Sequence, residues 1–409
     1  MRRGFLNDVR WFSVTQLAAG LLMLGYMMVA ARLLGREGEV ATFGLFQAVM
    51  GLYSIVLVLS FPLNVTAIHL VGRALPENRP TALGNCLMLA CAVGSICAVG
   101  LLVTWPQLAS LLHIESVSLM VEVSTLLMLS FVLTVFYGGL QGRHDYRRFA
   151  LAKILEAAVS FVAGTVLIAF GGGVMGAVGG YVFGMGLVCL VFLGFRSQYR
   201  FERVGPAWRK ELRSLGLPLA VTAVLSFTLA APMLLARWRM DATSAGLYAA
   251  LFSFRNVLQP FALTVSLPLY SRIVADRNEP WMVQKALAIV SLIAVGFLIV
   301  SVVCPQLCMR VLLGAKFVAA AGYLWEYAVA LGFFMVTMVV MFHAAARRTL
   351  RLYLLVLPLA GVVAIAFWPQ LTIGKTIRLQ IMAWVAFLLA QGLATLVDSR
   401  ESVQASATN

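Results

Sequence analysis

The sequence contains few charged residues, and acidic residues are especially scarce. Charged residues make up 11% of the 409 residues, with 16 Asp and Glu against 31 Lys and Arg. Soluble domains are about a quarter charged, whereas 62% of this chain is hydrophobic. A soluble fold could not cover so much apolar surface, but helices that face lipid require it. The composition therefore excludes a soluble enzyme and a soluble nucleic-acid-binding domain.

Several kinds of chemistry have no motif here. The six cysteines form no CxxC pair, and the four histidines show no spacing typical of a zinc site. No Gly-rich phosphate loop ends in Lys-Ser or Lys-Thr, so the sequence does not predict an ATPase. No soluble segment is long enough for a nucleotide-sugar transferase. We therefore expect a protein that is not an enzyme, with no catalytic residues, no metal and no cofactor.

Apolar runs of about twenty residues recur along the whole chain. They predict an all-α polytopic membrane protein with about 12 transmembrane helices. Arg2 and Arg3 precede the first run without an obvious cleavage site, which indicates a first span rather than a signal peptide. The predicted spans are 11–31, 43–66, 82–104, 117–139, 151–170, 174–195, 215–236, 245–270, 284–304, 323–342, 352–368 and 380–397.

The distribution of basic residues predicts the orientation. Twenty-two of the 31 Lys and Arg fall on the side of both termini, eight fall on the other side, and Arg255 lies within a span. Basic residues accumulate in cytoplasmic loops. All eight tryptophans also fall near predicted span ends, where indole rings prefer the headgroup level. We expect a multi-pass membrane protein with both termini cytoplasmic.

The longest basic segment divides the chain into two halves. A Gly-Leu-aromatic triplet begins at Gly44 in one half and at Gly246 in the other, and a Pro-Leu pair follows at Pro62 and at Pro268. Because six spans is an even number, the halves form a parallel pseudo-repeat. The expected units are an N-terminal six-helix lobe (1–200), a basic cytoplasmic linker (201–214), a C-terminal six-helix lobe (215–398) and a cytoplasmic tail (399–409).

Arg255 is the most unusual residue within a span. An isolated charge at mid-membrane costs at least about 2.5–3.5 kcal/mol, so the residue should face a cavity or a partner. Gln259 lies on the same helix face, and Pro260 cannot donate to the carbonyl of Asn256. A basic, kinked, polar patch of Arg255, Asn256 and Gln259 suits a diphosphate. The alternatives are a salt bridge between helices and a snorkelling arginine near a span end.

The polar residues at comparable positions in the first half are Gln47, Ser54 and Asn64. They are candidate substrate contacts, although most such residues hydrogen-bond to neighbouring helices. Lys153 and Glu156 are three residues apart and are expected to pair. Glycines also recur every fourth residue and predict close helix packing; they are Gly172, Gly176, Gly180 and Gly184.

Three stretches resemble the polysaccharide-biosynthesis (O-antigen flippase) proteins of the multidrug/oligosaccharidyl-lipid/polysaccharide exporter superfamily. Residues 31–52 contain an Arg-Leu-Leu-Gly loop followed by a Gly-Leu-aromatic helix start. Residues 138–159 contain a Gly-Leu-Gln-Gly turn with basic residues, and residues 171–186 form a Gly-rich hairpin. The likeness covers about 300 residues. The chain departs from relatives with fourteen spans, and its first span has no obvious acidic residue.

The resemblance implies a flippase that moves undecaprenyl-diphosphate-linked oligosaccharide across the bacterial inner (plasma) membrane for polysaccharide or O-antigen biosynthesis and export. Alternating access between two lobes would carry the headgroup. Membrane lipids and polysaccharide assembly proteins would be its partners, and no nucleic acid is expected. The alternatives are a multidrug exporter of the same superfamily, a membrane-embedded glycosyltransferase or polymerase, and a non-transporting assembly partner. A polymerase should have a large outside loop, and every predicted outside loop is short.

Overall fold

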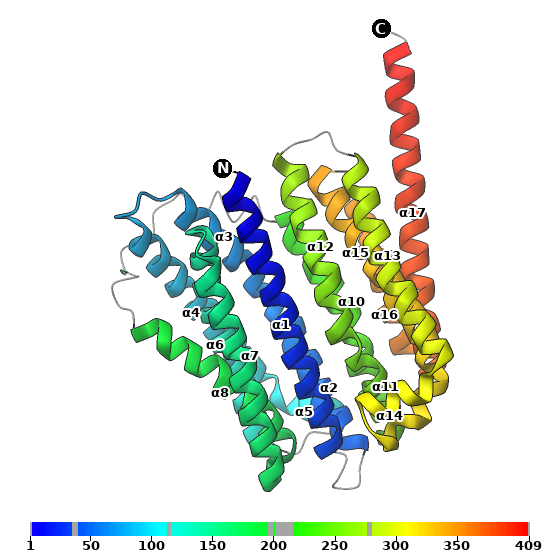
Figure 1. The fold of residues 1–409 in the computed structure, drawn as a ribbon. Helices are drawn as coiled ribbons and strands as arrows, with labels where there is room; N and C mark the ends of the chain where they lie inside the picture. Colours follow the sequence, from blue (N-terminus) through cyan, green and yellow to red (C-terminus); the bar gives the residue numbers. More distant parts are fainter. Residues whose placement is uncertain are drawn as a thin grey trace.

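The described part of the protein is built of helices. The computed structural model describes residues 2–34, 40–112, 116–194, 200, 216–275, 280–347 and 349–407. Within these residues all the regular structure is helical, and most helices run roughly parallel to one long axis (Figure 1). The predicted all-α polytopic class is confirmed. The predicted linker at 201–214 lies outside the described residues.

The helices of the N-terminal half coincide with the first six predicted spans. They are α1 (Arg2–Leu34), α2 (Val40–Leu57), η1 (Val58–Ser60), α3 (Phe61–Arg73), α4 (Arg79–Val103), α5 (Trp105–Leu112), α6 (Val117–Gly142), α7 (Tyr146–Leu167), η2 (Ile168–Gly172) and α8 (Gly173–Gly194).

The helices of the C-terminal half follow the same order. They are α10 (Gly216–Arg239), α11 (Ala242–Ser253), α12 (Arg255–Ala275), α13 (Pro280–Val303), α14 (Pro305–Leu312), η4 (Ala315–Tyr323), α15 (Leu324–Arg347), η5 (Leu352–Leu355), α16 (Val356–Phe367) and α17 (Ile373–Ala407). Residues 399–407, which the sequence assigned to a separate tail, instead continue α17.

Eight of the described segments are long and apolar enough by themselves to cross a membrane. One of them, Tyr146–Gly194, contains both α7 and α8, and Tyr353–Phe367 is a shorter apolar helix. The predicted spans 43–66 and 245–270 are each divided into two consecutive helices. Each of the twelve predicted spans therefore overlaps a helix or a pair of consecutive helices.

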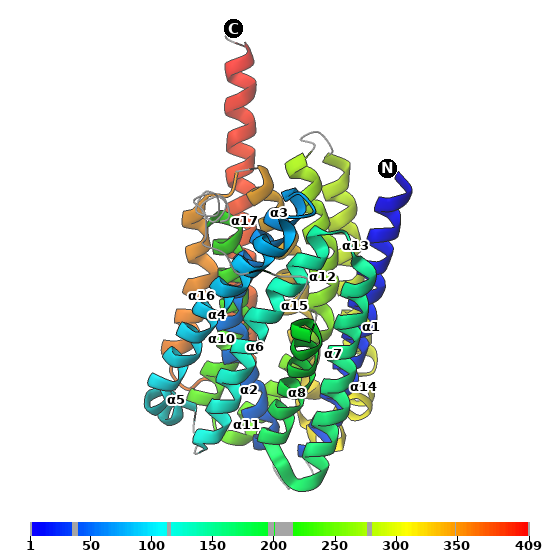
Figure 2. The ribbon, with the colours of Figure 1, turned by 90° about the vertical axis from the view of Figure 1, so that its left-hand side faces the viewer.

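The two halves pack their helices in matching ways. In the N-terminal half, α3 and α4 pack against α6, while α1 and α8 pack against α7. In the C-terminal half, α12 and α13 pack against α15, while α10 and α17 pack against α16. Each half also has a short eight-residue helix, α5 or α14, directly after its third span (Figure 2). These two short helices were not predicted from the sequence.

The Gly-rich hairpin has the predicted tight geometry. Gly171 and Gly173 adopt positive φ angles of 86° and 49°, which side chains disfavour. A Cβ atom on Gly180 would lie 2.4 Å from the Cα of Gly164, so the backbones of α7 and α8 are in direct contact. The prediction of close packing along this glycine strip is confirmed.

The predicted span 245–270 is divided at Phe254, which the sequence did not indicate. The N–H of Phe254 donates to the carbonyl of Leu251 at 3.1 Å in the tighter three-residue pattern. Pro260, which the sequence pointed to as the irregular position, lies inside α12, and this helix is continuous from Arg255 to Ala275. Arg255 is therefore the first residue of the second half-helix.

Candidate substrate site

The two halves contact each other closely at one end of the bundle. Gly44 of α2 lies against Gly246 of α11, and a Cβ atom on Gly44 would come within 2.9 Å of the Cα of Gly246. Phe43 packs edge-on against Phe317 of η4, with ring centroids 5.4 Å apart. We call this region the junction end. Both chain termini lie at the opposite end (Figure 1).

The pseudo-repeat motif therefore forms the contact between the halves. Gly44 and Gly246 are the first residues of the two Gly-Leu-aromatic triplets found in the sequence. Because both residues are glycines, no side chain separates the two helices, and the backbones of α2 and α11 come into direct contact. The sequence showed that the triplets repeat, but not that they touch.

Arg255 is buried at the start of α12. Its side chain is 8% exposed. Its Nε donates to Oε1 of Gln259 at 3.1 Å, and its Cζ lies 4.8 Å from the centre of the Phe252 ring. Its Nη1 is buried and has no hydrogen-bond partner. The predicted contact between Arg255 and Gln259 is thus present, and the ion pairs of the described residues do not include Arg255.

Aromatic hydroxyls and amides surround this guanidinium. Tyr248 and Tyr327 are fully buried, their rings meet edge-on at 6.2 Å, and both interact electrostatically with Arg255. Gln380 of α17 donates to the Tyr248 hydroxyl at 2.7 Å. Because Tyr327 belongs to α15, this side of α11 and α12 faces the interior of the C-terminal half. No spacing in the sequence indicates that Tyr248, Tyr327 and Gln380 meet, since they lie on three separate helices.

The candidate residues of the N-terminal half lie elsewhere. Gln47 is fully buried; its Nε2 donates to the sulfur of Met27 at 3.4 Å, and its Oε1 has no partner. Ser54 donates to the carbonyl of Gly51 within its own helix at 2.8 Å. Asn64 donates to the carbonyl of Thr134 on α6 at 2.9 Å.

The six candidate residues therefore do not form one cluster of bonded groups. Arg255 contacts Gln259, and Asn256 lies half-buried beside Arg255 in the chain. No hydrogen bond joins these residues to Gln47, Ser54 or Asn64 in the described part of the chain. Of the first-half candidates, only Gln47 has a buried polar atom left for a further partner.

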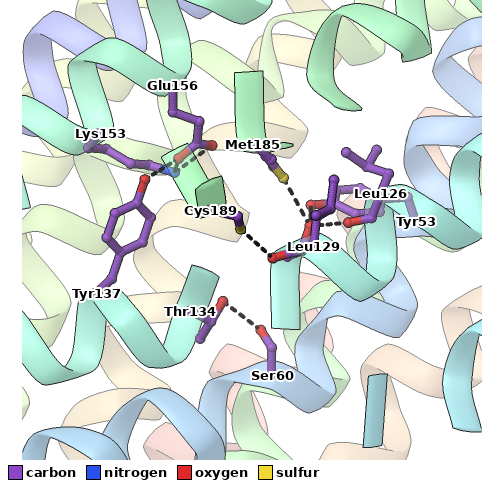
Figure 3. A network of polar contacts seen from close by, with 11 residues as sticks. Tyr53, Ser60, Leu126, Leu129, Thr134, Tyr137, Lys153, Glu156, Met185 and Cys189 are labelled. Carbon is purple, nitrogen blue, oxygen red and sulfur yellow. Dashed lines mark hydrogen bonds and ion pairs between the residues drawn. The ribbon is translucent and has the colours of Figure 1, made fainter. Parts of the chain in front are cut away.

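A second polar network occupies the interior of the N-terminal half (Figure 3). The Glu156 carboxylate is buried, and the Lys153 Nζ donates to both of its oxygens at 3.0 Å. The Tyr137 hydroxyl of α6 donates to Glu156 at 2.5 Å. The predicted pairing of Lys153 with Glu156 is confirmed, and Tyr137 is a third member that the sequence did not reveal. The Glu156 carboxylate is thus bonded by both the Lys153 ammonium and the Tyr137 hydroxyl.

Nothing in the described residues resembles a metal centre, because no group of three or more His, Cys, Asp or Glu side chains converges there. The buried polar groups around Arg255 are instead tyrosines and amides, which together with the guanidinium can bind anions and sugar hydroxyls by hydrogen bonding.

Solved structures with the same fold are membrane transporters. The lipid II flippase MurJ in an inward closed conformation is similar with a TM-score of 0.71 and 15% identity, covering 93% of this chain and 87% of that chain. An inward-facing multidrug resistance MATE family transporter of the MOP superfamily gives 0.69 and 15%, covering 95% and 98%. A MOP superfamily transporter from Pyrococcus furiosus gives 0.64 and 16%, covering 96% and 95%.

The helices and the comparisons define a multi-pass membrane protein whose fold is shared with transporters of the MOP superfamily. No curated protein sequence matches the chain. The model of the polysaccharide biosynthesis protein family matches residues 5–274. The chain belongs to this polysaccharide biosynthesis protein family.

Proposed function

We propose that the protein is a flippase that moves lipid-linked oligosaccharide across the bacterial inner membrane, with both termini in the cytoplasm. The family and the excess of basic residues on the side of the termini support this assignment. The proposed substrate class is an undecaprenyl-diphosphate-linked oligosaccharide used in polysaccharide or O-antigen biosynthesis. The similar MurJ structure belongs to a protein described as a lipid II flippase, whose substrate class is related.

The observation that supports an anionic headgroup best is the state of Arg255. A guanidinium buried within a membrane protein is costly unless an anion or hydrogen-bond acceptors surround it. Here Nε is bonded to Gln259, while Nη1 has no partner. No carboxylate in the described residues pairs with this arginine. A phosphate oxygen would satisfy Nη1 and neutralise the charge.

Polar residues of the first half would contact the sugars. Gln47 offers the unpartnered Oε1, which accepts a hydrogen bond from a sugar hydroxyl. Ser54 and Asn64 each donate one hydrogen bond within the protein, and their side-chain oxygens can still accept a hydrogen bond from a sugar. We place Asn256 with Arg255 and Gln259 on the phosphate side.

Alternating access would make this transfer possible. A charged, sugar-bearing headgroup cannot cross hydrocarbon without polar contacts, whereas its lipid tail can remain in the bilayer. The close contacts at the junction end separate the site from that side of the membrane. We infer that this conformation receives substrate from the side of the termini and that opening of the junction end releases it.

The test is export of surface glycan by cells that carry Arg255 variants. Arg255→Ala removes the charge and should reduce export at least tenfold. Arg255→Lys should keep part of the export, because lysine retains the charge but lacks the planar guanidinium that binds a phosphate through two hydrogen bonds. Arg239→Ala is the matched control, since Arg239 lies at a helix end and donates to Trp368 O in its own half. Membrane levels of each variant are measured in parallel.

Normal export by Arg255→Ala would contradict a headgroup contact at this position. If the gene proves dispensable for glycan export but its loss raises sensitivity to toxic cations, the protein is a multidrug exporter instead. Accumulation of lipid-linked oligosaccharide on the cytoplasmic face of the deletion strain separates transport from a supporting role in polysaccharide assembly.

A further inference from the structure

The last turn of α1 is bonded to the opposite half of the protein. Arg32 lies two residues before the end of α1. Its Nη2 donates to the carbonyl of Val311, in the last turn of the short helix α14. The Arg32 side chain also lies against Gly314, where a Cβ atom would be 3.6 Å from the Cγ of Arg32. A residue of the first span thus binds the short helix of the other half.

The last turn of α10 makes the corresponding bond in the reverse direction. Arg237 lies two residues before the end of α10, and its Nε donates to the carbonyl of Leu112 at 3.2 Å. Leu112 is the last residue of α5, the short helix of the N-terminal half. The donor position and the length of the short helix therefore agree between the halves, and the acceptor carbonyls differ by one residue. A chance surface contact would not be expected to occur twice in the same pseudo-symmetric place.

The acceptors are well suited to arginine. The last four carbonyls of a helix have no partner within that helix, and the C-terminal end carries partial negative charge. A cationic donor at this position makes a charge-assisted hydrogen bond. Arg32 is exposed, whereas Arg237 is half-buried, so the bond of Arg237 is better shielded from water.

These two bonds differ from other arginine contacts nearby because they cross between the halves. Arg239, two residues beyond Arg237, donates to the carbonyl of Trp368 in its own half at 3.3 Å. Movement of the halves as rigid bodies leaves that bond intact. Separation at the junction end, by contrast, removes Arg32 from Val311 and Arg237 from Leu112.

We propose that Arg32 and Arg237 form a symmetric pair of inter-half bonds that hold the junction end closed and set how often it opens. The inference rests on the alternating-access part of the proposed function, but not on the identity of the substrate. Each arginine closes one side of the junction, around the Gly44–Gly246 contact. Release of both bonds is then the step that allows substrate to leave on that side.

The experiment measures the distance between α5 and α14 in the full-length protein in lipid nanodiscs. Spin labels are attached to cysteines at Ser110 and Gln306, which are exposed and belong to opposite halves, after the six native cysteines have been replaced. Pulsed electron paramagnetic resonance gives the distribution of distances between the two labels, and therefore the fraction of molecules in which α5 and α14 are separated. Arg32→Ala, Arg237→Ala, the double variant and the control Arg239→Ala are compared with the parent.

We expect Arg237→Ala to raise the ratio of separated to closed molecules about tenfold, and Arg32→Ala about threefold because its bond is exposed to water. The double variant should multiply the two effects, and Arg239→Ala should leave the ratio unchanged. Arg32→Gln and Arg237→Gln remove the charge, keep part of the side-chain stem and replace any alanine variant that fails to fold.

A double variant with the distance distribution of the parent would overturn the inference. An equal shift in Arg239→Ala would also overturn it, because the effect would then be a general loss of positive charge at this face. Shifted distances in a protein that has no role in glycan export would leave the inter-half bonds established and the proposed function wrong.

Discussion

Removal of Lys153 should destabilise the protein far more than neutralisation of Glu156. Lys153→Met leaves a buried carboxylate with the Tyr137 hydroxyl as its remaining partner among the bonds of this cluster. Breaking a buried pair in this way costs about 3–5 kcal/mol, and we expect about 3 kcal/mol because the lysine side chain is 33% exposed. Glu156→Gln leaves a lysine that can reach the interface, and should cost about 1 kcal/mol.

The measurement is unfolding in detergent micelles by titration with sodium dodecyl sulfate, followed by circular dichroism. The variants are Lys153→Met, Glu156→Gln and the double variant, which form a thermodynamic cycle. The double variant should be more stable than Lys153→Met alone, since no buried charge remains. Our reasoning would be refuted if Glu156→Gln cost as much as Lys153→Met, or if the two effects were additive.

Four further substitutions test the packing and the local backbone, each by the same unfolding measurement. Gly180→Ala should cost about 1–3 kcal/mol because its Cβ would meet the α7 backbone, whereas Gly186→Ala, with an ordinary contact at 3.8 Å, should cost little. Gly171→Ala should cost about 1 kcal/mol from its positive φ, and Gly171→Asn less.

Asp241→Ala should cost about 1 kcal/mol, because the carboxylate accepts the Ser244 N–H at 2.8 Å and caps α11. That bond lowers the pKa of Asp241, so its stabilisation is present at neutral pH and is lost as the pH falls through the lowered value. The difference between the parent and Asp241→Ala should therefore shrink in acid.

The places of the spans could be predicted from the sequence because apolar runs of about twenty residues reflect the thickness of the bilayer. Short helices carry no such signal. The segments Trp105–Leu112 and Pro305–Leu312 have eight residues each, and the predicted spans 82–104 and 284–304 end just before them. The division of the span 245–270 at Phe254 was also not predicted, because the sequence pointed to Pro260 as the irregular position and α12 runs on through that residue.

Within the candidate site and the second polar network, the sequence predicted only the contacts between residues on the same helix. Arg255 with Gln259, and Lys153 with Glu156, follow from spacings of four and three residues. Tyr248 and Tyr327, in contrast, are 79 positions apart and meet through tertiary packing that no spacing reveals. The same holds for the contact between Gly44 and Gly246, although their shared triplet made both visible as a repeat.

The length of α17 has a practical consequence for measurements on living cells. Its 35 residues correspond to about 52 Å, well beyond the roughly 30 Å of a hydrocarbon core, and its end projects past the other helices in Figure 1. A fluorescent protein fused to the carboxyl terminus would therefore be carried on a rigid stalk, clear of the bilayer. Such a reporter should leave the junction end, on the far side of the molecule, free to move.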